Sequence, residues 1–283
     1  MHVESDTVIV APFRRDDPEA LFEEAKQHQR QRRIRLAFAL ALTAVVAAGA
    51  YGIFGRGVAS SAGESPARGI PLVTASNPTV VLLVDVSGSM RANDIAPTRI
   101  VAVQRALRVL VARLPKRSKV GVVAFSANAE VFAQPTLDRN VVLGAIANLT
   151  PQAGTALGEG LAAAVKLAVT SLNHDGVQRA SGHLLPADIV LASDGAQNRG
   201  ALSPLQAANL ARSAGIRVDA IALGTAQGKV SLAYGEYKQS IPVPPDPKAV
   251  ALIARVTGGA SFDAEAAGRL DSIYRTLGSS IGR

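Results

Sequence analysis

The sequence contains no cysteine and no tryptophan, and aromatic side chains make up only 4% of its 283 residues. The lack of cysteine excludes disulfide bonds, thiolate metal sites and a cysteine nucleophile, while it leaves the redox compartment open. The scarcity of aromatic residues argues against a stacking platform for single-stranded nucleic acid. Charged residues are also few, at 18% against 48% hydrophobic residues, so the composition favours a sizeable core over global disorder.

The net charge of +8 is unevenly distributed along the chain. Residues 1–35 hold seven basic and seven acidic side chains, so the excess lies in residues 36–283. A positive excess of this size favours solubility, and it also favours attraction to an acidic partner or an anionic surface. No run of basic residues in this part is dense enough to indicate a nucleic-acid partner.

One segment, residues 36–54, is long enough to cross a membrane. It contains 19 residues without a charge, and a spanning helix needs about 20. Basic residues gather before it, so the positive-inside rule predicts residues 1–35 in the cytoplasm and the remainder of the chain outside the cell membrane. We expect a single transmembrane helix; the alternatives are a cleaved signal peptide, ending near Ala48-Gly49-Ala50, and a buried core helix. Residues 55–77 are rich in Gly, Ser, Ala and Pro, which is typical of a linker.

From residue 78 to residue 283, apolar strand patterns alternate with amphipathic helix patterns. This alternation predicts one α/β domain, a doubly wound and mostly parallel sheet with helices on both faces. The expected strands are Thr79–Val84, Lys119–Phe125, Ala129–Phe132, Ala187–Ala192, Arg217–Leu223 and Ala260–Asp263, with a hairpin over residues 229–243. The expected helices are Thr98–Leu114, Asn140–Leu149, Leu157–Leu172, Pro204–Ala214, Lys248–Val256 and Glu265–Ile281.

The first strand ends in a run of oxygen-bearing side chains. Asp85, Ser87 and Ser89 follow five apolar residues at every second position, so in an extended segment they point the same way. Thr155 opens a helix in Gly154-Thr155-Ala156, and Asp194 ends another apolar strand. Because the carboxyl ends of parallel strands share one edge, these loops can meet there. Hydroxyls and carboxylates suit a hard cation such as Mg²⁺.

Each of these residues also has a purely structural interpretation. Asp85 and Asp194 can terminate turns, Ser87 and Ser89 can bond the loop backbone, and Thr155 can cap the following helix. Asp94 lies near the site in sequence and is either a group supporting it or an ordinary surface residue. The joint occurrence of all five oxygen-bearing residues at predicted strand ends favours the metal site.

The three loops resemble those of the von Willebrand factor A domain. Asp85-Val86-Ser87-Gly88-Ser89, Gly154-Thr155 and Ser193-Asp194-Gly195 occur in the order and spacing of that family, over roughly residues 77–281. The resemblance implies a metal-ion-dependent adhesion site. Ser87, Ser89 and Thr155 would bind Mg²⁺ (or Mn²⁺ or Ca²⁺) through their hydroxyls, and Asp85 and Asp194 directly or through water. A carboxylate from a partner protein would complete the octahedron.

Within the family, the chain is most similar to bacterial membrane-anchored proteins of the BatA type. The stretches 94–99, 243–247 and 257–259 carry this closer match. Such proteins often occur with a MoxR-type ATPase, which the resemblance suggests as a partner system. They commonly have further membrane helices, whereas only one is predicted here.

The predicted function is therefore a binding module rather than an enzyme: on the outer face of a membrane, a metal ion would bridge the domain to an Asp or Glu of another protein. A phosphatase of the haloacid-dehalogenase type would need a second Asp where Ser87 stands, and a serine nucleophile would need a base nearby. No Walker A pattern occurs. A metal-dependent phosphatase-like enzyme and a metal-independent scaffold remain the alternatives.

Overall fold

A six-stranded sheet with strand order β3-β2-β1-β4-β5-β8 forms the centre of the domain. The structure is a computed structural model that describes residues 77–177, 185–234 and 237–281. The sheet strands are β1 Thr79–Asp85, β2 Lys119–Phe125, β3 Ala129–Thr136, β4 Ala187–Ser193, β5 Arg217–Leu223 and β8 Ser261–Ala264. The helices are α2 Arg99–Arg113, α3 Arg139–Ala147, α4 Leu157–His174, α5 Pro204–Ala214, α6 Pro247–Thr257 and α7 Ala267–Ser280, with a 3₁₀ helix η1 at Gly88–Arg91.

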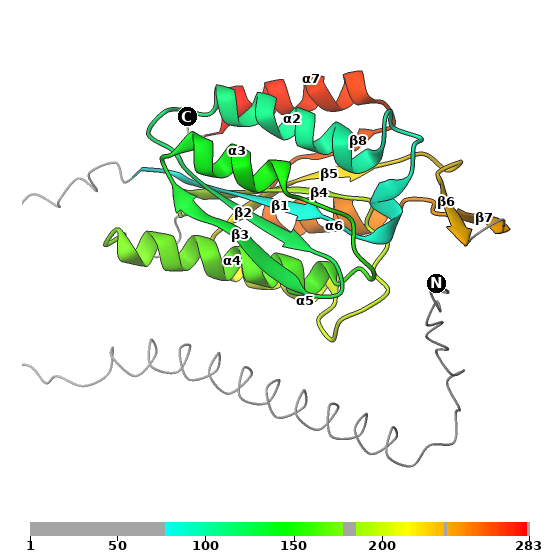
Figure 1. The fold of residues 1–283 in the computed structure, drawn as a ribbon. Coiled ribbons are helices and arrows are strands. Elements are labelled where there is room, and N and C mark those ends of the chain that lie inside the picture. Colours follow the sequence, from blue (N-terminus) through cyan, green and yellow to red (C-terminus); the bar gives the residue numbers. More distant parts are fainter. Residues whose placement is uncertain (1–76, 178–184, 235–236, 282–283) are drawn as a thin grey trace, which may run out of the picture. The chain divides into compact units, whose positions relative to one another are not determined.

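Helices cover both faces of this sheet, as the alternating pattern predicts. Figure 1 shows α2, α3 and α7 on one face and α4, α5 and α6 on the other. In β1, Val80, Leu82 and Val84 pack toward the first group, whereas Val81 and Leu83 pack toward the second. A strand buried on both sides needs an unbroken apolar run, which explains the composition of β1.

The direction in which successive strands are added to the sheet changes between β1 and β4: the chain proceeds from β1 outward to β3, and then from β4 outward to β8 on the other side. Strand β1 pairs in parallel with β2 on one side and with β4 on the other, and β4, β5 and β8 continue in parallel. Doubly wound sheets bind ligands at such a switch point, beyond the carboxyl ends of the strands. The predicted site residues Asp85 and Asp194 follow these two neighbouring strands, so the topology brings them together.

The helix boundaries follow local sequence signals. At α5, Ser203 and Gln206 form a reciprocal capping box, Pro204 occupies the first turn, and Gly215 ends the helix in the left-handed conformation. The Asp246 side chain likewise caps α6 by accepting from the backbone N–H of Ala249 at 3.2 Å. These signals are local, which is why the helix limits could be predicted to within about two residues.

Two features differ from the sequence-based expectation, whereas the predicted hairpin is confirmed. Strand β3 runs to Thr136 instead of Phe132 and pairs antiparallel with β2 at the edge of the sheet. The loop after β1 contains η1, which the sequence pattern does not predict. The hairpin consists of β6 Lys229–Tyr234 and β7 Tyr237–Pro242, a separate two-stranded sheet whose β6 contacts η1.

The predicted segments 1–35 and 36–54, and the predicted linker 55–77 as far as residue 76, lie outside the described residues. Among the residues that are described, no helix is both long and apolar enough to span a bilayer.

Candidate metal centre

Asp85 lies fully buried at the carboxyl end of β1. Its Oδ1 accepts a hydrogen bond from the backbone N–H of Ser87 at 2.8 Å, and its Oδ2 accepts from the Ser193 hydroxyl at 2.6 Å. Burial, followed by the negative charge of Asp194, raises the pKa of Asp85 from its ordinary 3.8 to about 7. An ionised carboxylate at this position therefore lacks compensating positive charge, which a cation would supply.

The two serines of the first loop lie side by side. The hydroxyl oxygens of Ser87 and Ser89 are 2.9 Å apart, and Ser89 also hydrogen-bonds the carboxylate of Asp194. Ser87 is buried and Ser89 is half-buried. The two hydroxyls are brought together by the 3₁₀ turn of η1, in which Ser89 lies, and not by the extended segment that the alternation of the sequence predicts.

Asp194 is buried at the end of β4 and is held from several sides. Its Oδ2 accepts from Nη1 of Arg99 at 3.1 Å, and its Oδ1 accepts from the backbone N–H of Ala196 at 3.3 Å. Burial raises the pKa of Asp194, and the hydrogen bond from Ser89 and the charge of Arg99 act in the opposite direction. Unlike Asp85, this carboxylate has a cationic partner within the protein.

Thr155 belongs to the loop that enters α4, and this loop is fixed to the two strand ends. The backbone N–H of Gln152 donates to the carbonyl of Val86 at 2.6 Å, and that of Ala156 to the carbonyl of Ser126 at 2.7 Å. From the other side, the Asn198 side chain accepts from the backbone N–H of Thr155 at 3.0 Å. Thr155 is 3% exposed, and its loop contacts the segments that follow β1, β2 and β4.

Asp94 pairs with Arg99 and does not join the hydroxyl cluster. The guanidinium of Arg99 donates to both its carboxylate oxygens, at 2.8 and 2.7 Å, and the backbone N–H of Thr225 donates at 2.7 Å. Burial alone would raise the pKa of Asp94, but the hydrogen bonds from Arg99 and Thr225 and the guanidinium charge outweigh it and lower the pKa below its ordinary value. Asp94 is therefore ionised at neutral pH.

Two carboxylates and the paired hydroxyls of Ser87 and Ser89, with Thr155 in the adjoining loop, make a donor set that fits a hard divalent cation. In the part of the chain that the structure describes, no group of three or more His, Cys, Asp or Glu side chains could hold a metal ion. A cation at this edge would therefore rest on serine and threonine oxygens and on water as well as on Asp85 and Asp194. Mg²⁺, which retains several waters in protein sites, matches such a set.

Sequence reasoning missed two residues of this arrangement and left a third open. Ser193 orients Asp85, and its place directly before Asp194 at a strand end was a usable signal. Asn198 orients the Thr155 loop, and nothing in the sequence pattern marks it. The sequence allows Arg99 to be either a partner of Asp94 or a solvated side chain; it is a partner of Asp94 and is fully buried.

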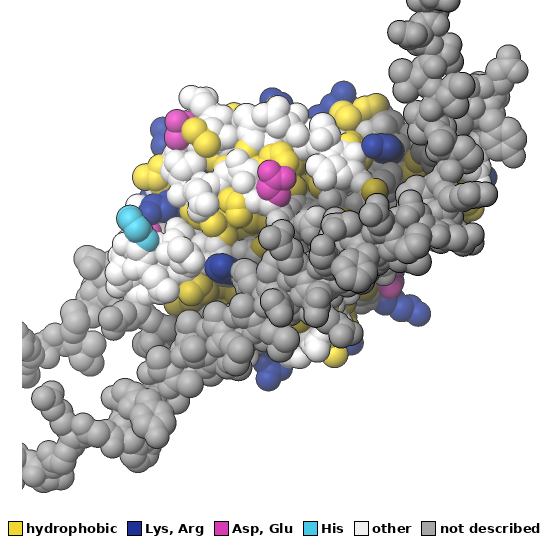
Figure 2. All heavy atoms as spheres, turned by 60° about the horizontal axis from the view of Figure 1, so that its bottom comes forward, with side chains coloured by type: hydrophobic (Ala, Val, Ile, Leu, Met, Phe, Trp, Pro, Cys, Tyr) yellow, Lys and Arg dark blue, Asp and Glu magenta, His cyan; other side chains and the backbone are white. Residues whose placement is uncertain are grey.

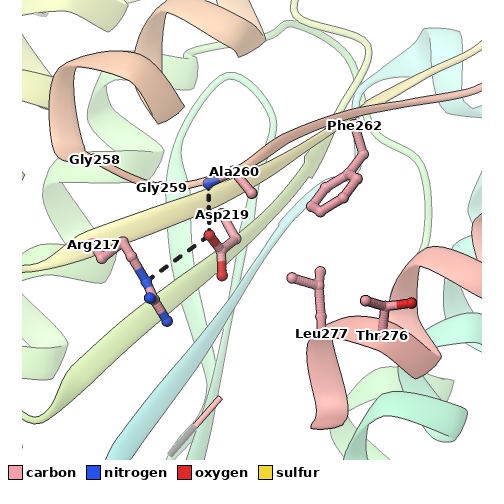
Figure 3. A pocket seen from close by; sticks show the side chains of 8 residues that line it. All are labelled: Arg217, Asp219, Gly258, Gly259, Ala260, Phe262, Thr276 and Leu277. Carbon is pink, nitrogen blue, oxygen red and sulfur yellow. Dashed lines mark hydrogen bonds and ion pairs between the residues drawn. The ribbon is translucent and has the colours of Figure 1, made fainter. Parts of the chain in front are cut away.

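A pocket lies at the opposite edge of the sheet, near the amino end of β5. Figure 3 shows Asp219 accepting from the backbone N–H of Ala260 at 2.8 Å, with Nε of Arg217 at 4.0 Å and with Phe262 and Leu277 on the apolar side. None of the predicted site residues lines this pocket.

Residues 80–197 match the von Willebrand factor type A domain. A UPF0353 protein of Nocardia farcinica is 34% identical over 233 residues, which cover 79% of this chain and 68% of that protein. The chain belongs to the von Willebrand factor A family. It spans about 60% of the length of the mycobacterial UPF0353 proteins that it also matches at 34% identity or slightly less.

Solved structures agree with this assignment at the level of the fold. BatB from Bacteroides thetaiotaomicron aligns with a TM-score of 0.59 and 21% identity, over 71% of this chain and 97% of that one. An aerotolerance-related membrane protein from Bacteroides fragilis aligns with a TM-score of 0.59 and 20% identity, over 72% of this chain and 98% of that one. Proximal thread matrix protein 1 from the mussel byssus, with a zinc-occupied MIDAS motif, aligns with a TM-score of 0.50 and 20% identity, over 72% of this chain and 46% of that one. The predicted kinship with a bacterial von Willebrand factor A protein of the BatA/BatB type is thereby confirmed.

Proposed function

We propose that this domain binds an acidic side chain of a partner protein through a divalent cation, Mg²⁺ in the first place, held by Asp85, Ser87, Ser89, Thr155 and Asp194. The observation that carries the proposal is the convergence of two buried carboxylates and a pair of adjacent hydroxyls at the switch point of the sheet. When bound, the cation supplies a concentrated positive charge to which a carboxylate from outside can coordinate.

The protein's own residues prepare the site for this role. Ser87 and Ser193 fix both oxygens of Asp85, and Ser89 and Ala196 restrain Asp194. The donors are thus ordered before a cation arrives, so little rearrangement is needed on binding. This rigidity favours a binding site over a mobile surface loop.

Exposed cations at the same edge support an acidic partner. Arg91 lies in η1, Arg199 lies beside Gly154 in the loop that contacts Thr155, and Lys248 lies in the first turn of α6, whose cap residue Asp246 bonds the carbonyl of Asp194. Together with the net charge of +8, they would speed the approach of an acidic partner. On the part of the face in Figure 2 that is not drawn in grey, Lys and Arg side chains lie scattered and do not form one continuous patch.

The test is a pull-down from membranes with the full chain as bait, in Mg²⁺ and in chelator, alongside two variants. Asp85→Ala removes a proposed ligand, whereas Asp175→Ala removes a carboxylate paired with Lys119 near the amino end of β2, away from the site. We expect the wild type and Asp175→Ala to retain a partner protein in Mg²⁺ but not in chelator, and Asp85→Ala to retain it in neither condition. Identical prey under all conditions would favour a metal-independent scaffold and refute the metal bridge.

We further propose that residues 36–54 anchor the chain in a membrane, with residues 1–35 in the cytoplasm and the domain of residues 78–283 outside. The similarity to a Bacteroides fragilis membrane protein supports the anchor. With this topology a cytoplasmic MoxR-type ATPase would have to contact residues 1–35, so its recovery with bait lacking those residues would contradict the topology. Protection of the domain from external protease in intact cells would contradict it as well.

An enzymatic role is less well supported. Ser87 takes the position of the second Asp that a phosphatase of the haloacid-dehalogenase type needs. His174 ends α4, and its side chain is 90% exposed and lies 3.8 Å from Asp175. We therefore propose that the protein is not an enzyme. Turnover of p-nitrophenyl phosphate by the wild type that is lost in Asp85→Ala would overturn this.

A further inference from the structure

Arg99 is a fully buried cation in the first turn of α2. Its guanidinium donates through Nε and Nη2 to the two oxygens of Asp94, through Nη1 to Oδ2 of Asp194 at 3.1 Å, and through Nη2 to the carbonyl of Val243 at 3.0 Å. A buried guanidinium needs charged partners and filled donor positions, and two carboxylates and a carbonyl provide them here. Arg99 therefore connects Asp94 to a proposed metal-binding residue.

The backbone around Arg99 is shaped to hold it in place. A Cβ added at Gly224 or at Gly228 would collide with the guanidinium, and Gly224 has a φ of +111°, which favours glycine. The backbone and hydroxyl of Thr225 donate to Asp94, and Val243 donates its N–H to the carbonyl of Gly228 at 2.8 Å. The base of the β6–β7 hairpin thus encloses the side chain and fixes its orientation toward Asp194.

We propose that Arg99 is a positioning residue that holds Oδ2 of Asp194 and partly neutralises the negative charge that Asp194 presents to the cation. This inference rests on the proposed function of the site. With Arg99 present, the three carboxylates at positions 85, 94 and 194 and the guanidinium together carry two negative charges, which a divalent cation neutralises. Without Arg99 the loaded site keeps one negative charge, which repels an incoming carboxylate.

Two substitutions then act in opposite directions. Arg99→Gln removes the positive charge, so the site binds a divalent cation more tightly and a carboxylate on that cation more weakly. Asp94→Asn removes one negative charge and leaves Asp194 as the only charged partner of Arg99. The cation should then bind more weakly, and a carboxylate on that cation more tightly. Damage to the structure would weaken both events in both variants, which separates a charge-setting role from a merely structural one.

The experiment uses the full chain with Mn²⁺ as the metal probe and sodium acetate as the carboxylate probe. Water-proton relaxation reports Mn²⁺ binding, and the loss of relaxation on addition of acetate reports displacement of water from the bound ion. For Arg99→Gln we expect Mn²⁺ affinity to rise about tenfold and acetate affinity to fall by a similar factor, each equivalent to about 1.4 kcal/mol. Arg99→Lys, which keeps the charge, should restore both affinities toward the wild-type values.

The failures of the two proposals are distinguishable. If the wild type binds no Mn²⁺, the proposed metal site itself is wrong. If the wild type binds Mn²⁺ and acetate, but Arg99→Gln weakens or leaves unchanged Mn²⁺ binding, only the role assigned to Arg99 is overturned. If Arg99→Gln does not fold, Asp94→Asn decides alone: weaker Mn²⁺ binding with tighter acetate binding supports the role, and any other pattern overturns it.

Discussion

The charge on Asp85 should destabilise the metal-free domain at neutral pH. The folded state raises the pKa of Asp85 from 3.8 to about 7 because the carboxylate is buried and lies near Asp194. Between these pH values the folded state holds a proton that the unfolded chain has released, so stability falls as the pH rises from about 4 to about 7. Asp85→Asn removes the charge and keeps the shape of the side chain.

The expected gain in the free energy of unfolding from Asp85→Asn is sizeable. A pKa difference of one unit between the folded and unfolded states corresponds to about 1.36 kcal/mol. The rise from 3.8 to about 7 therefore corresponds to a destabilisation on the order of 4 kcal/mol when Asp85 is fully ionised. In Asp85→Asn the side-chain amide can still accept from the N–H of Ser87, but the Ser193 hydroxyl loses its acceptor, at a cost of about 1 kcal/mol. We therefore expect Asp85→Asn to be about 2 to 3 kcal/mol more stable than the wild type at pH 8 without metal, and no more stable than the wild type at pH 4.

Urea unfolding in chelator, followed by far-UV circular dichroism because the chain lacks tryptophan, measures this difference across pH. Addition of Mg²⁺ at 100 times its dissociation constant should stabilise the wild type by about 2.7 kcal/mol and leave Asp85→Asn unchanged. Asp175→Asn, at an exposed ion pair, serves as the control. Parallel stability curves for the wild type and Asp85→Asn from pH 4 to pH 8 would refute the reasoning.

Three further substitutions test the packing around the site. Gly158→Ala should destabilise the domain by about 1 to 3 kcal/mol in thermal unfolding, because its Cβ would collide with the backbone of the loop before α5. Asn198→Ala removes the acceptor for the Thr155 N–H and should weaken Mg²⁺ binding in calorimetric titration, with a loss of about 1 to 2 kcal/mol in stability. Tyr274→Phe should be neutral or stabilising by up to about 1 kcal/mol in urea unfolding, because the buried hydroxyl has no hydrogen-bond partner among the described residues.

Matched controls separate these causes from general damage. Gly144→Ala lies in α3 with nothing within 4 Å of the added Cβ, so it should stabilise by about 0.5 to 1 kcal/mol. If it destabilised as much as Gly158→Ala, the collision would not be the cause. An unchanged Mg²⁺ affinity in Asn198→Ala, or a loss above about 2 kcal/mol in Tyr274→Phe, would contradict the roles assigned to those side chains.

The core elements could be predicted because their signals are local. Strands β2 and β5 have the predicted limits, because both are mainly apolar after an initial basic residue; Asp219 is the one charged residue inside β5. Strand β3 is longer than predicted because it lies at the sheet edge, where Glu130 and Gln134 are exposed and the apolar pattern fades. Its antiparallel direction depends on how it pairs with β2, which no local signal encodes.

The proximity of Asp85 and Asp194 could be predicted for a topological reason. Asp85 and Asp194 meet because parallel strands place their carboxyl ends at one edge, a rule that needs only the order of the elements. Beyond its possible pairing with Asp94, the environment of Arg99 could not be predicted, because its other partners lie at positions 194 and 243 and its enclosure depends on two glycines of another loop. Long-range burial of this kind follows from packing rather than from sequence pattern.

The most direct test of the metal site is a calorimetric titration of Mg²⁺ into the full chain, the Asp85→Ala variant and the Asp175→Ala variant. One Mg²⁺ should bind per chain in the wild type and in Asp175→Ala, with an accompanying rise in the unfolding temperature, and none should bind in Asp85→Ala. Absence of Mg²⁺ and Mn²⁺ binding in the wild type, or equal binding in Asp85→Ala, would contradict the proposed site.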